Sequence, residues 1–275
     1  IVADSECYSR ADVIRYVTSV CRAMLGPPPL IEAGAQFYGY FPDEKPILGA
    51  RAVAAAAGQS VRFTVRDLQY GPARCNPKVV FQESVKLARR GGEAVAQVRW
   101  APNRLMASRY RVTVTLLREG KPVDVLEHEI TVRHPCGTPG GVGRPTTFVR
   151  VDRGQFSLNG KPWYPHGVNY MPSSGIAAED GHYFEQWLSS ESYDPLVVDR
   201  DLRRVRDIGF NMVSAFIYTE STHNHNLVDF LNRCDAYGLR VNLSLRPGTP
   251  LDFQWPDIGE IIKANRLADD PTVFA

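Results

Sequence analysis

Apolar and polar side chains alternate through the middle of the chain. Between residues 47 and 134, the runs "SVRFTVRDL", "AVAQVRW", "RYRVTVTLL" and "HEITVRHP" place an apolar side chain at about every second position. Alternation with a period of two indicates strands with one buried and one exposed side. Turn signals such as Gly71-Pro72 separate the runs. The pattern predicts an antiparallel, all-β sandwich over residues 46–134, in which we find no polar cluster suited to catalysis.

The segments on either side of this sandwich follow other patterns. Residues 11–25 carry apolar side chains at steps of three and four, which predicts a helix that ends at Gly26. We interpret 1–45 as a lead-in, as expected for the tail of a preceding domain. The stretch "PCGTPGGVGRP" (135–145) predicts a linker. Its glycines do not predict a phosphate loop, because a strand and not a helix follows them.

The period changes again in residues 146–275. The stretch "FVRVDRGQFSLNGKPWYPHGVNY" predicts a small hairpin and then a strand that includes Lys161–Val168. The later pattern predicts, in order, a helix after Asp194-Pro195, a strand over 210–218, a helix from Asn226, a strand over 239–245 and a helix over 257–268. Strands that alternate with helices imply parallel strands with right-handed crossovers. This part therefore fits either an open doubly wound sheet or the start of a (β/α)₈ barrel.

Polar and aromatic side chains gather where the predicted parallel strands end. In both α/β architectures, ligand-binding groups lie at the carboxyl ends of the strands. Aromatic faces stack on the C–H groups of a sugar ring, and amides, imidazoles and guanidinium groups bind its hydroxyls. We therefore predict a carbohydrate-binding site formed by His166, Asn169, Tyr170, Phe216, Tyr218, Glu220 and Arg246.

Several of these residues also have a structural interpretation. His166 could be a hydrogen-bonded core histidine, and Tyr218 and Phe216 could pack inside a barrel. Arg246 could form an ion pair with Glu220 or Asp252. The histidines of "THNHN", His223 and His225, could form half of a metal site. No third ligand is evident nearby, so we expect an exposed loop there and no metal.

The third part of the chain resembles clan A glycoside hydrolases. The stretch "FSLNGKPWYPHGVNYMP" resembles the first barrel strand of the cellulase and mannanase type (family 5) and the β-galactosidase and β-mannosidase type (family 2). "YDPLVVDRDLRRVRDIGFNMVSAFIY" resembles the second unit, "LNRCDAYGLRVNLSL" the third, and "RLADDPTVFA" the segment before strand four. The sandwich resembles the immunoglobulin-like domains often fused to such barrels. The resemblance covers about residues 146–275.

The resemblance implies a multi-domain fold: an immunoglobulin-like sandwich followed by the first three βα units of a (β/α)₈ barrel. It also implies a retaining glycosidase that cleaves a β-linked poly- or oligosaccharide with two carboxylates. In the family these carboxylates follow strands four and seven, positions that would fall beyond Ala275. We therefore expect no catalytic residue in this chain and expect the rest of the same protein to complete the barrel. Two departures are that Ser214 stands where many members have Arg, and that no His lies near Leu245 or Arg246.

The composition argues against some classes of binding partner. The chain has 44% hydrophobic and 23% charged residues and a formal net charge of +2, which is ordinary for a globular protein. It lacks the basic block typical of nucleic-acid binding and an apolar run long enough to span a membrane. Five scattered cysteines without a C-x-x-C pair predict reduced, structural thiols. We expect no cofactor. The start shows no signal peptide and no initial Met, which we interpret as a processed or excised segment, and the resemblance favours an extracellular or periplasmic protein.

Three other hypotheses remain open at this point. A non-catalytic carbohydrate-binding protein could keep the same strand ends without the carboxylate pair. A scaffold or interaction protein could rely on the sandwich alone. A catalyst within this chain could use Glu220 with Asp180 or Glu185.

Overall fold

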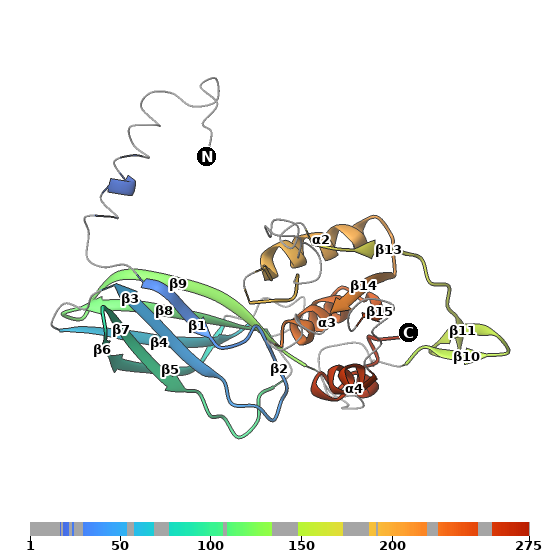
Figure 1. The fold of residues 1–275 in the computed structure, drawn as a ribbon, viewed down its shortest axis with the longest axis horizontal. Helices are drawn as coiled ribbons and strands as arrows, with labels where there is room; N and C mark the ends of the chain where they lie inside the picture. Colours follow the sequence, from blue (N-terminus) through green and yellow to red (C-terminus); the bar gives the residue numbers. More distant parts are fainter. Residues whose placement is uncertain are drawn as a thin grey trace.

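The protein contains a β-sandwich and an α/β unit that pack against each other (Figure 1). The computed structural model describes residues 17, 19–21, 24, 30–53, 58–68, 77–106, 109–133, 148–172, 187–190, 192–218, 225–246 and 255–274. Within this part, strands outnumber helices. None of the described helices is long and apolar enough to cross a membrane.

The sandwich consists of two sheets around one apolar core. One sheet has the order β1-β3-β7-β6 and the other β2-β9-β8-β4-β5. The strands are β1 (Leu30–Ala35), β2 (Gly39–Tyr40), β3 (Ile47–Val53), β4 (Gln59–Asp67), β5 (Lys78–Lys86), β6 (Ala88–Arg90), β7 (Glu93–Arg99), β8 (Arg109–Arg118) and β9 (Lys121–Val132). Alternate residues in the middle of β4 are fully buried, namely Val61, Phe63 and Val65. The alternation therefore predicted the sandwich correctly.

The sandwich begins earlier than residue 46. β1 pairs antiparallel with β3, and β2 pairs in parallel with β9. Both strands lie in the stretch 1–45, which the sequence pattern assigned to a lead-in. The pattern missed them because β1 has an irregular register between Leu30 and Glu32, and because β2 has only 2 residues. The predicted helix over 11–25 and the linker over 135–145 lie largely outside the described residues.

The α/β unit has the predicted order of strands and helices. Three parallel strands, β13 (Gly167–Tyr170), β14 (Met212–Tyr218) and β15 (Arg240–Arg246), form a sheet in chain order. Helix α2 (Pro195–Asp207) lies between the first two strands and α3 (Asn226–Ala236) between the last two, and α4 (Trp255–Ala264) and the 3₁₀ turn η3 (Leu267–Asp269) follow.

The described part of the chain ends where a fourth strand is expected. Val273 forms a parallel bridge to Val241 of β15. Ala275, beyond which the sequence analysis placed the two catalytic carboxylates, lies outside the described residues. The described residues do not form a closed barrel. The barrel and the carboxylates that would follow its fourth and seventh strands therefore stay predictions.

Local chemistry explains where α2 begins and which side it buries. The Asp194 carboxylate caps the helix by accepting hydrogen bonds from the backbone N–H groups of Leu196 and Val197, at 2.8 and 3.3 Å. Val198 and Leu202 lie on one side of the helix and are fully buried. They join a core that includes the helix-facing residues of the parallel sheet.

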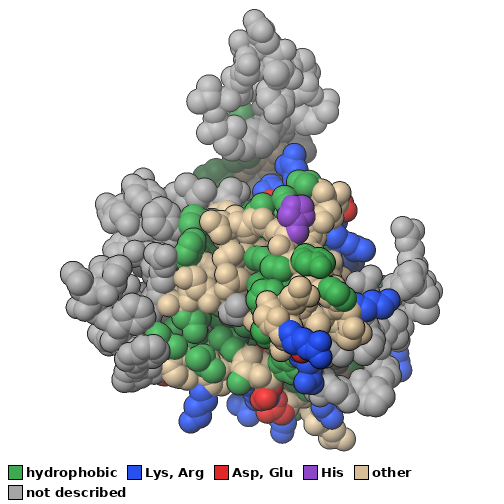
Figure 2. Space-filling view, turned by 90° about the vertical axis from the view of Figure 1, so that its right-hand side faces the viewer, with side chains coloured by type: hydrophobic (Ala, Val, Ile, Leu, Met, Phe, Trp, Pro, Cys, Tyr) green, Lys and Arg blue, Asp and Glu red, His purple; other side chains and the backbone are tan. Residues whose placement is uncertain are grey.

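A small hairpin sheet precedes the parallel strands and projects from the body of the protein (Figure 1). It consists of β10 (Arg150–Asp152), β11 (Gln155–Leu158) and β12 (Lys161–Pro162). The strand predicted over Lys161–Val168 is therefore divided between β12 and β13. The rings of Phe156, Trp163 and Phe274 lie 5.1–6.1 Å apart and join the hairpin to the residue after Val273. Figure 2 views this end and shows apolar side chains in the middle of the face, with most Lys and Arg toward its margins.

Buried polar contacts join the sandwich to α3. Asp229 is fully buried and accepts hydrogen bonds from Thr131 of β9 at 2.7 Å, Tyr193 at 2.6 Å and Arg233 at 2.7 Å. Burial acts to lower the pKa of Arg233, but Asp229, Tyr193 and Asp199 together outweigh it and hold that pKa above its usual value. Gly39 lies so close to α3 that an added Cβ would be 2.5 Å from the Asp229 nitrogen. The two units therefore meet through matched polar groups and a close backbone approach.

A second set of contacts extends this interface on both sides. Asp199 of α2 accepts hydrogen bonds from Arg109 of β8 at 2.7 Å and from Tyr237 at 2.9 Å. Burial acts to raise the pKa of Asp199, but Arg109 and Tyr237 outweigh it, so the pKa is lowered. Arg133, directly after β9, forms a buried ion pair with Asp270. A buried ion pair is stable only when its groups keep their hydrogen-bond partners. Because the partners here lie on different units, these contacts hold the sandwich and the α/β unit in one relative position.

Candidate functional site

The two faces of the parallel sheet have different chemistry. Val213, Ala215 and Ile217 of β14 are fully buried against the helices. The intervening positions form a polar row across the sheet, because Asn169 is in register with Ser214, and Ser214 with Asn242. The Asn242 amide donates a hydrogen bond to Ser214 Oγ at 3.3 Å. The face away from the helices therefore presents amide and hydroxyl groups.

Tyr218 and Arg246 lie opposite each other in register at the carboxyl ends of β14 and β15. They stand four residues after Ser214 and Asn242, so they occupy the same alternate positions as the polar row. Their side chains lie outside the described residues. Glu220 also lies outside them, as do Asp180 and Glu185, so the proposal of a catalyst within this chain is untested.

Phe216 is the third predicted residue on β14. It stands between Ser214 and Tyr218 in the alternation, and its side chain is half-buried. The Trp187 indole N–H donates a hydrogen bond to its carbonyl oxygen at 2.9 Å. Because Trp187 is itself almost fully buried, this bond holds the end of the strand against the core. The aromatic side chain of Phe216 is thereby fixed beside the polar row.

Tyr170 belongs to the core and not to the sugar-binding face. It is in register with Ala215 on the helix side of the sheet, and 6% of it is exposed. Its ring stacks on Phe230 at 5.7 Å and meets the edge of Trp187 at 6.1 Å. Burial raises the pKa of its hydroxyl. The prediction that Tyr170 contacts substrate is corrected, because the register places the preceding residue, Asn169, on the open face.

His166 lies at the opposite end of the sheet from Tyr218 and Arg246. It precedes β13, and its N–H donates to the Asn211 Oδ1 at 2.8 Å while its carbonyl accepts from the Asn211 N–H at 2.9 Å. Its exposed ring packs edge-on against Phe210 at 4.8 Å. The sequence placed His166 near the strand ends because it treated Lys161–Val168 as one strand. Since β13 starts only at Gly167, His166 is at the amino end.

His225 is held by the sandwich and does not form part of a metal site with described residues. It precedes α3 with a left-handed φ of 56°, and its ring stacks on Phe37 at 4.4 Å. Its Nδ1 lies 3.5 Å from the Glu44 carboxylate. No group of three possible metal ligands occurs among the described residues. His223 lies outside them.

Asn242 is a polar residue of this face that the sequence analysis did not include in the predicted site. It lies inside the run "LRVNLSL", which reads as an ordinary buried strand. The feature that could have identified Asn242 is its register with polar residues on the neighbouring strands. The register between strands cannot be read from the sequence of one segment alone.

Cys234 is fully buried in α3, and burial raises the pKa of its thiol well above the usual value. This matches the predicted structural role for that cysteine. Cys21 is exposed. The three other cysteines lie outside the described residues.

Comparison with known proteins gives low similarity to solved glycosidase structures. No protein family matches the sequence, and no curated protein matches it either. The chain is similar to a β-glucuronidase from Parabacteroides merdae, with 16% identity over 89% of this chain and 28% of that one, at a TM-score of 0.35. It is also similar to a glycosyl hydrolase family 2 member from Bacteroides cellulosilyticus DSM 14838, with 19% identity over 90% of this chain and 31% of that one, at a TM-score of 0.35.

A third similar structure is an FMN-binding β-glucuronidase from Facaelibacterium prausnitzii L2-6, with 15% identity over 88% of this chain and 32% of that one, at a TM-score of 0.32. The chain thus spans 28% to 32% of the length of these three proteins. Identities and TM-scores at this level are too low to determine the function of the chain.

Proposed function

We propose that the α/β unit is the first part of a (β/α)₈ barrel in a retaining glycoside hydrolase, and that its strand ends bind a β-linked poly- or oligosaccharide. The observation that carries this proposal is the register of the parallel sheet. It brings Tyr218 opposite Arg246 and aligns Asn169, Ser214 and Asn242 on the face away from the helices. In a barrel that face is the interior, and ligands bind at the carboxyl ends of its strands.

The polar row supports a ligand-binding interior. Barrel interiors are usually filled with branched apolar side chains, whereas this face presents two amides and a hydroxyl. Such groups donate and accept hydrogen bonds, as sugar hydroxyls require. The half-buried Phe216 adds an aromatic ring beside them. We assign substrate contact to Asn169, Phe216, Tyr218, Glu220 and Arg246.

The rest of the same protein would complete the barrel. The parallel bridge between Val241 and Val273 marks the position where a fourth strand would continue the sheet. A retaining glycosidase needs two carboxyl groups about 5–5.5 Å apart, one as acid and base and one as nucleophile. In this proposal they follow strands four and seven, beyond Ala275, so the present chain supplies substrate binding and support but not the catalytic pair.

Kinetics on the complete protein that contains these residues test the proposal. We expect hydrolysis of at least one member of a panel of nitrophenyl β-glycosides. Arg246→Ala removes a charged hydrogen-bond donor and should lower kcat/KM by about tenfold or more. Lys121→Ala, at the exposed start of β9 in the sandwich, serves as the control and should leave kcat/KM unchanged.

Two results would contradict the proposal in different ways. Sugar binding without turnover would favour a non-catalytic carbohydrate-binding protein. Unchanged kinetics in both Arg246→Ala and Tyr218→Ala would show that substrate does not reach these strand ends.

A further inference from the structure

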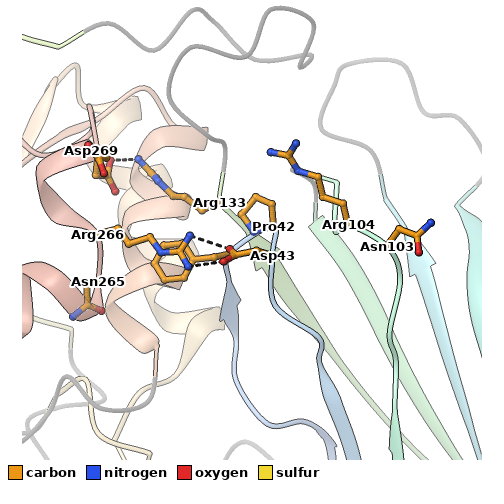
Figure 3. A pocket seen from close by; sticks show the side chains of 10 residues that line it. Pro42, Asp43, Asn103, Arg104, Arg133, Asn265, Arg266 and Asp269 are labelled. Atoms are coloured by element: carbon orange, nitrogen blue, oxygen red, sulfur yellow. Dashed lines mark hydrogen bonds and ion pairs between the residues drawn. The ribbon is translucent and has the colours of Figure 1, made fainter.

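A pocket of about 620 Å³ opens where the sandwich meets the segment from α4 to η3 (Figure 3). One wall comes from the sandwich loops that carry Asp43 and Arg104, and the other from Arg266 and Asp269. Pockets for small organic ligands usually measure about 300–1,000 Å³. The space is therefore large enough for a ligand of one or two sugar rings.

This pocket lies at the amino end of the parallel sheet. Thr272, close to the pocket residue Asp270, accepts a hydrogen bond through its carbonyl from the N–H of Val241, the second residue of β15. Arg133, which lines the pocket, donates to Thr272 Oγ1 at 2.9 Å. The sugar-binding strand ends proposed above lie at the carboxyl end of β15. The pocket is thus a separate site.

Two ion pairs hold the pocket walls in place, and each joins the sandwich to the α/β unit. Arg266 binds both oxygens of the Asp43 carboxylate, each at 2.9 Å, and its guanidinium carbon lies 4.0 Å from the centre of the Phe41 ring. Arg133 forms the buried ion pair with Asp270, and both residues line the pocket. The buried Arg133–Asp270 pair holds the two walls together before any ligand arrives, which reduces the entropy lost on binding, and the exposed Arg266–Asp43 pair adds less.

Other polar groups of the pocket are left available. Within the described part of the chain, the side chains of Asn103, Arg104 and Asp269 form no hydrogen bond or ion pair. Figure 3 shows Arg104 directed from the sandwich toward the α4–η3 side. Its charge also adds to the effect of Arg266 in lowering the pKa of Asp43. A free guanidinium and a free carboxylate therefore line one preformed space.

The overall charge of the lining selects the kind of ligand. The charged residues are three arginines and three aspartates, so their formal charges cancel: Arg104, Arg133, Arg266, Asp43, Asp269 and Asp270. An anion would meet the carboxylates, and an apolar ligand would leave charged groups without partners. Sugar hydroxyls accept from guanidinium and donate to carboxylate. We propose that this pocket is a second binding site, which takes a neutral mono- or disaccharide between Arg104 and Asp269.

Ligand-observed NMR with cellobiose as the probe tests this proposal. The measurement uses the Arg246→Ala chain, in which binding at the strand ends is weakened, so that the pocket contributes most of the observed binding. Cellobiose should still bind. Adding Arg104→Ala, or Asp269→Asn, should weaken the remaining affinity about tenfold or more. The matched controls are Arg118→Ala and Asp152→Asn, exposed residues outside the pocket, which should leave the affinity unchanged.

Three outcomes would overturn the proposal, and none of them depends on hydrolysis. If Arg246→Ala alone abolished cellobiose binding, the strand ends would be the binding site and the pocket would not bind cellobiose. Equal binding with and without Arg104 would place the sugar elsewhere. Tighter binding of gluconate or of glycylglycine than of cellobiose, lost in Arg104→Ala, would show that the pocket takes an anion or a zwitterion. The two proposals are tested independently: the pocket can bind sugar even if the protein hydrolyses no glycoside, and the protein can hydrolyse a glycoside even if the pocket binds no sugar.

Discussion

Thr131 of the sandwich donates a hydrogen bond to Asp229 of α3, with 2.7 Å between Oγ1 and Oδ1. Both residues are fully buried, and Asn232 donates a further hydrogen bond to the same Thr131 oxygen at 2.9 Å. Thr131 therefore connects two polar residues of one helix to a strand of the other unit. The sandwich and the α/β unit consequently depend on each other for stability.

Thr131→Val should destabilise the protein by about 1–3 kcal/mol, because it leaves a buried carboxylate oxygen and a buried amide without their partner. Thr115→Val is the matched control. Thr115 lies on β8 with a half-buried side chain that contacts neither Asp229 nor Asn232, and its change should stay within about 0.5 kcal/mol. Urea denaturation of both variants gives the comparison. Equal stability of the two would show that the interface contributes little.

Gly39→Ala should also destabilise the protein, by roughly 1–3 kcal/mol or more, through overpacking. The added Cβ would lie 2.5 Å from the Asp229 nitrogen and 2.8 Å from the His225 carbonyl oxygen, and neither backbone atom can turn aside. Gly49→Ala is the control, because its Cβ would meet nothing closer than 3.9 Å. Thermal unfolding of the two variants separates a steric effect from a general glycine effect. A normal midpoint for Gly39→Ala would contradict the close approach of β2 and α3.

Stability should fall in acid because of His128. Burial lowers the pKa of this imidazole to about 4, against the opposing charge of Asp229, and its Nε2 accepts a hydrogen bond from the Ala35 N–H at 3.1 Å. The unfolded chain, with a pKa near 6.5, binds more protons between about pH 6.5 and pH 4 than the folded chain does. The stabilisation is therefore complete above about pH 6.5 and is lost as the pH falls toward 4, by about 3 kcal/mol.

Denaturation of wild type and His128→Gln across this pH range measures the effect. Glutamine cannot titrate but can still accept a hydrogen bond, so its unfolding free energy should depend less on pH by about that amount. An identical pH dependence in the two proteins would show that other groups cause the acid loss.

Tyr170 and Arg246 should respond differently to mutation. Tyr170→Phe should leave sugar affinity unchanged and alter stability by less than about 1 kcal/mol, because the ring packs in the core between Phe230 and Trp187. Arg246→Ala should weaken sugar binding without a comparable loss of stability. Titration with cellobiose, together with thermal unfolding, checks both. Weaker sugar binding by Tyr170→Phe would show that the Tyr170 hydroxyl contacts the sugar after all.

Periodicity in the sequence was enough to predict the sandwich and the order of the α/β unit, but not every strand. Period-two alternation identified β4, β7, β8 and β9, and the steps of three and four identified α2 and α3. These elements carry their own signal because one side of each is buried over several residues. β1 and β2 carry no such signal and are defined by their partners, β3 and β9.

The candidate site was harder to predict, because register decides which side chain faces the ligand. A shift of one residue exchanges the two faces of a strand, and this shift separates Asn169 from the buried Tyr170. The division of the strand before Gly167 likewise moved His166 to the other end of the sheet. The sequence analysis did not single out Asp229, because its partner Thr131 lies 98 residues away and cannot be recognised from sequence.

The central claim is that these residues form part of a retaining glycoside hydrolase. The most direct test is proton NMR of the complete protein acting on whichever nitrophenyl β-glycoside it cleaves, followed from the first minutes of reaction. The account predicts that the β-anomer of the released sugar appears first and only later equilibrates with the α-anomer. First appearance of the α-anomer, or no cleavage of any β-glycoside in the panel, would contradict the claim.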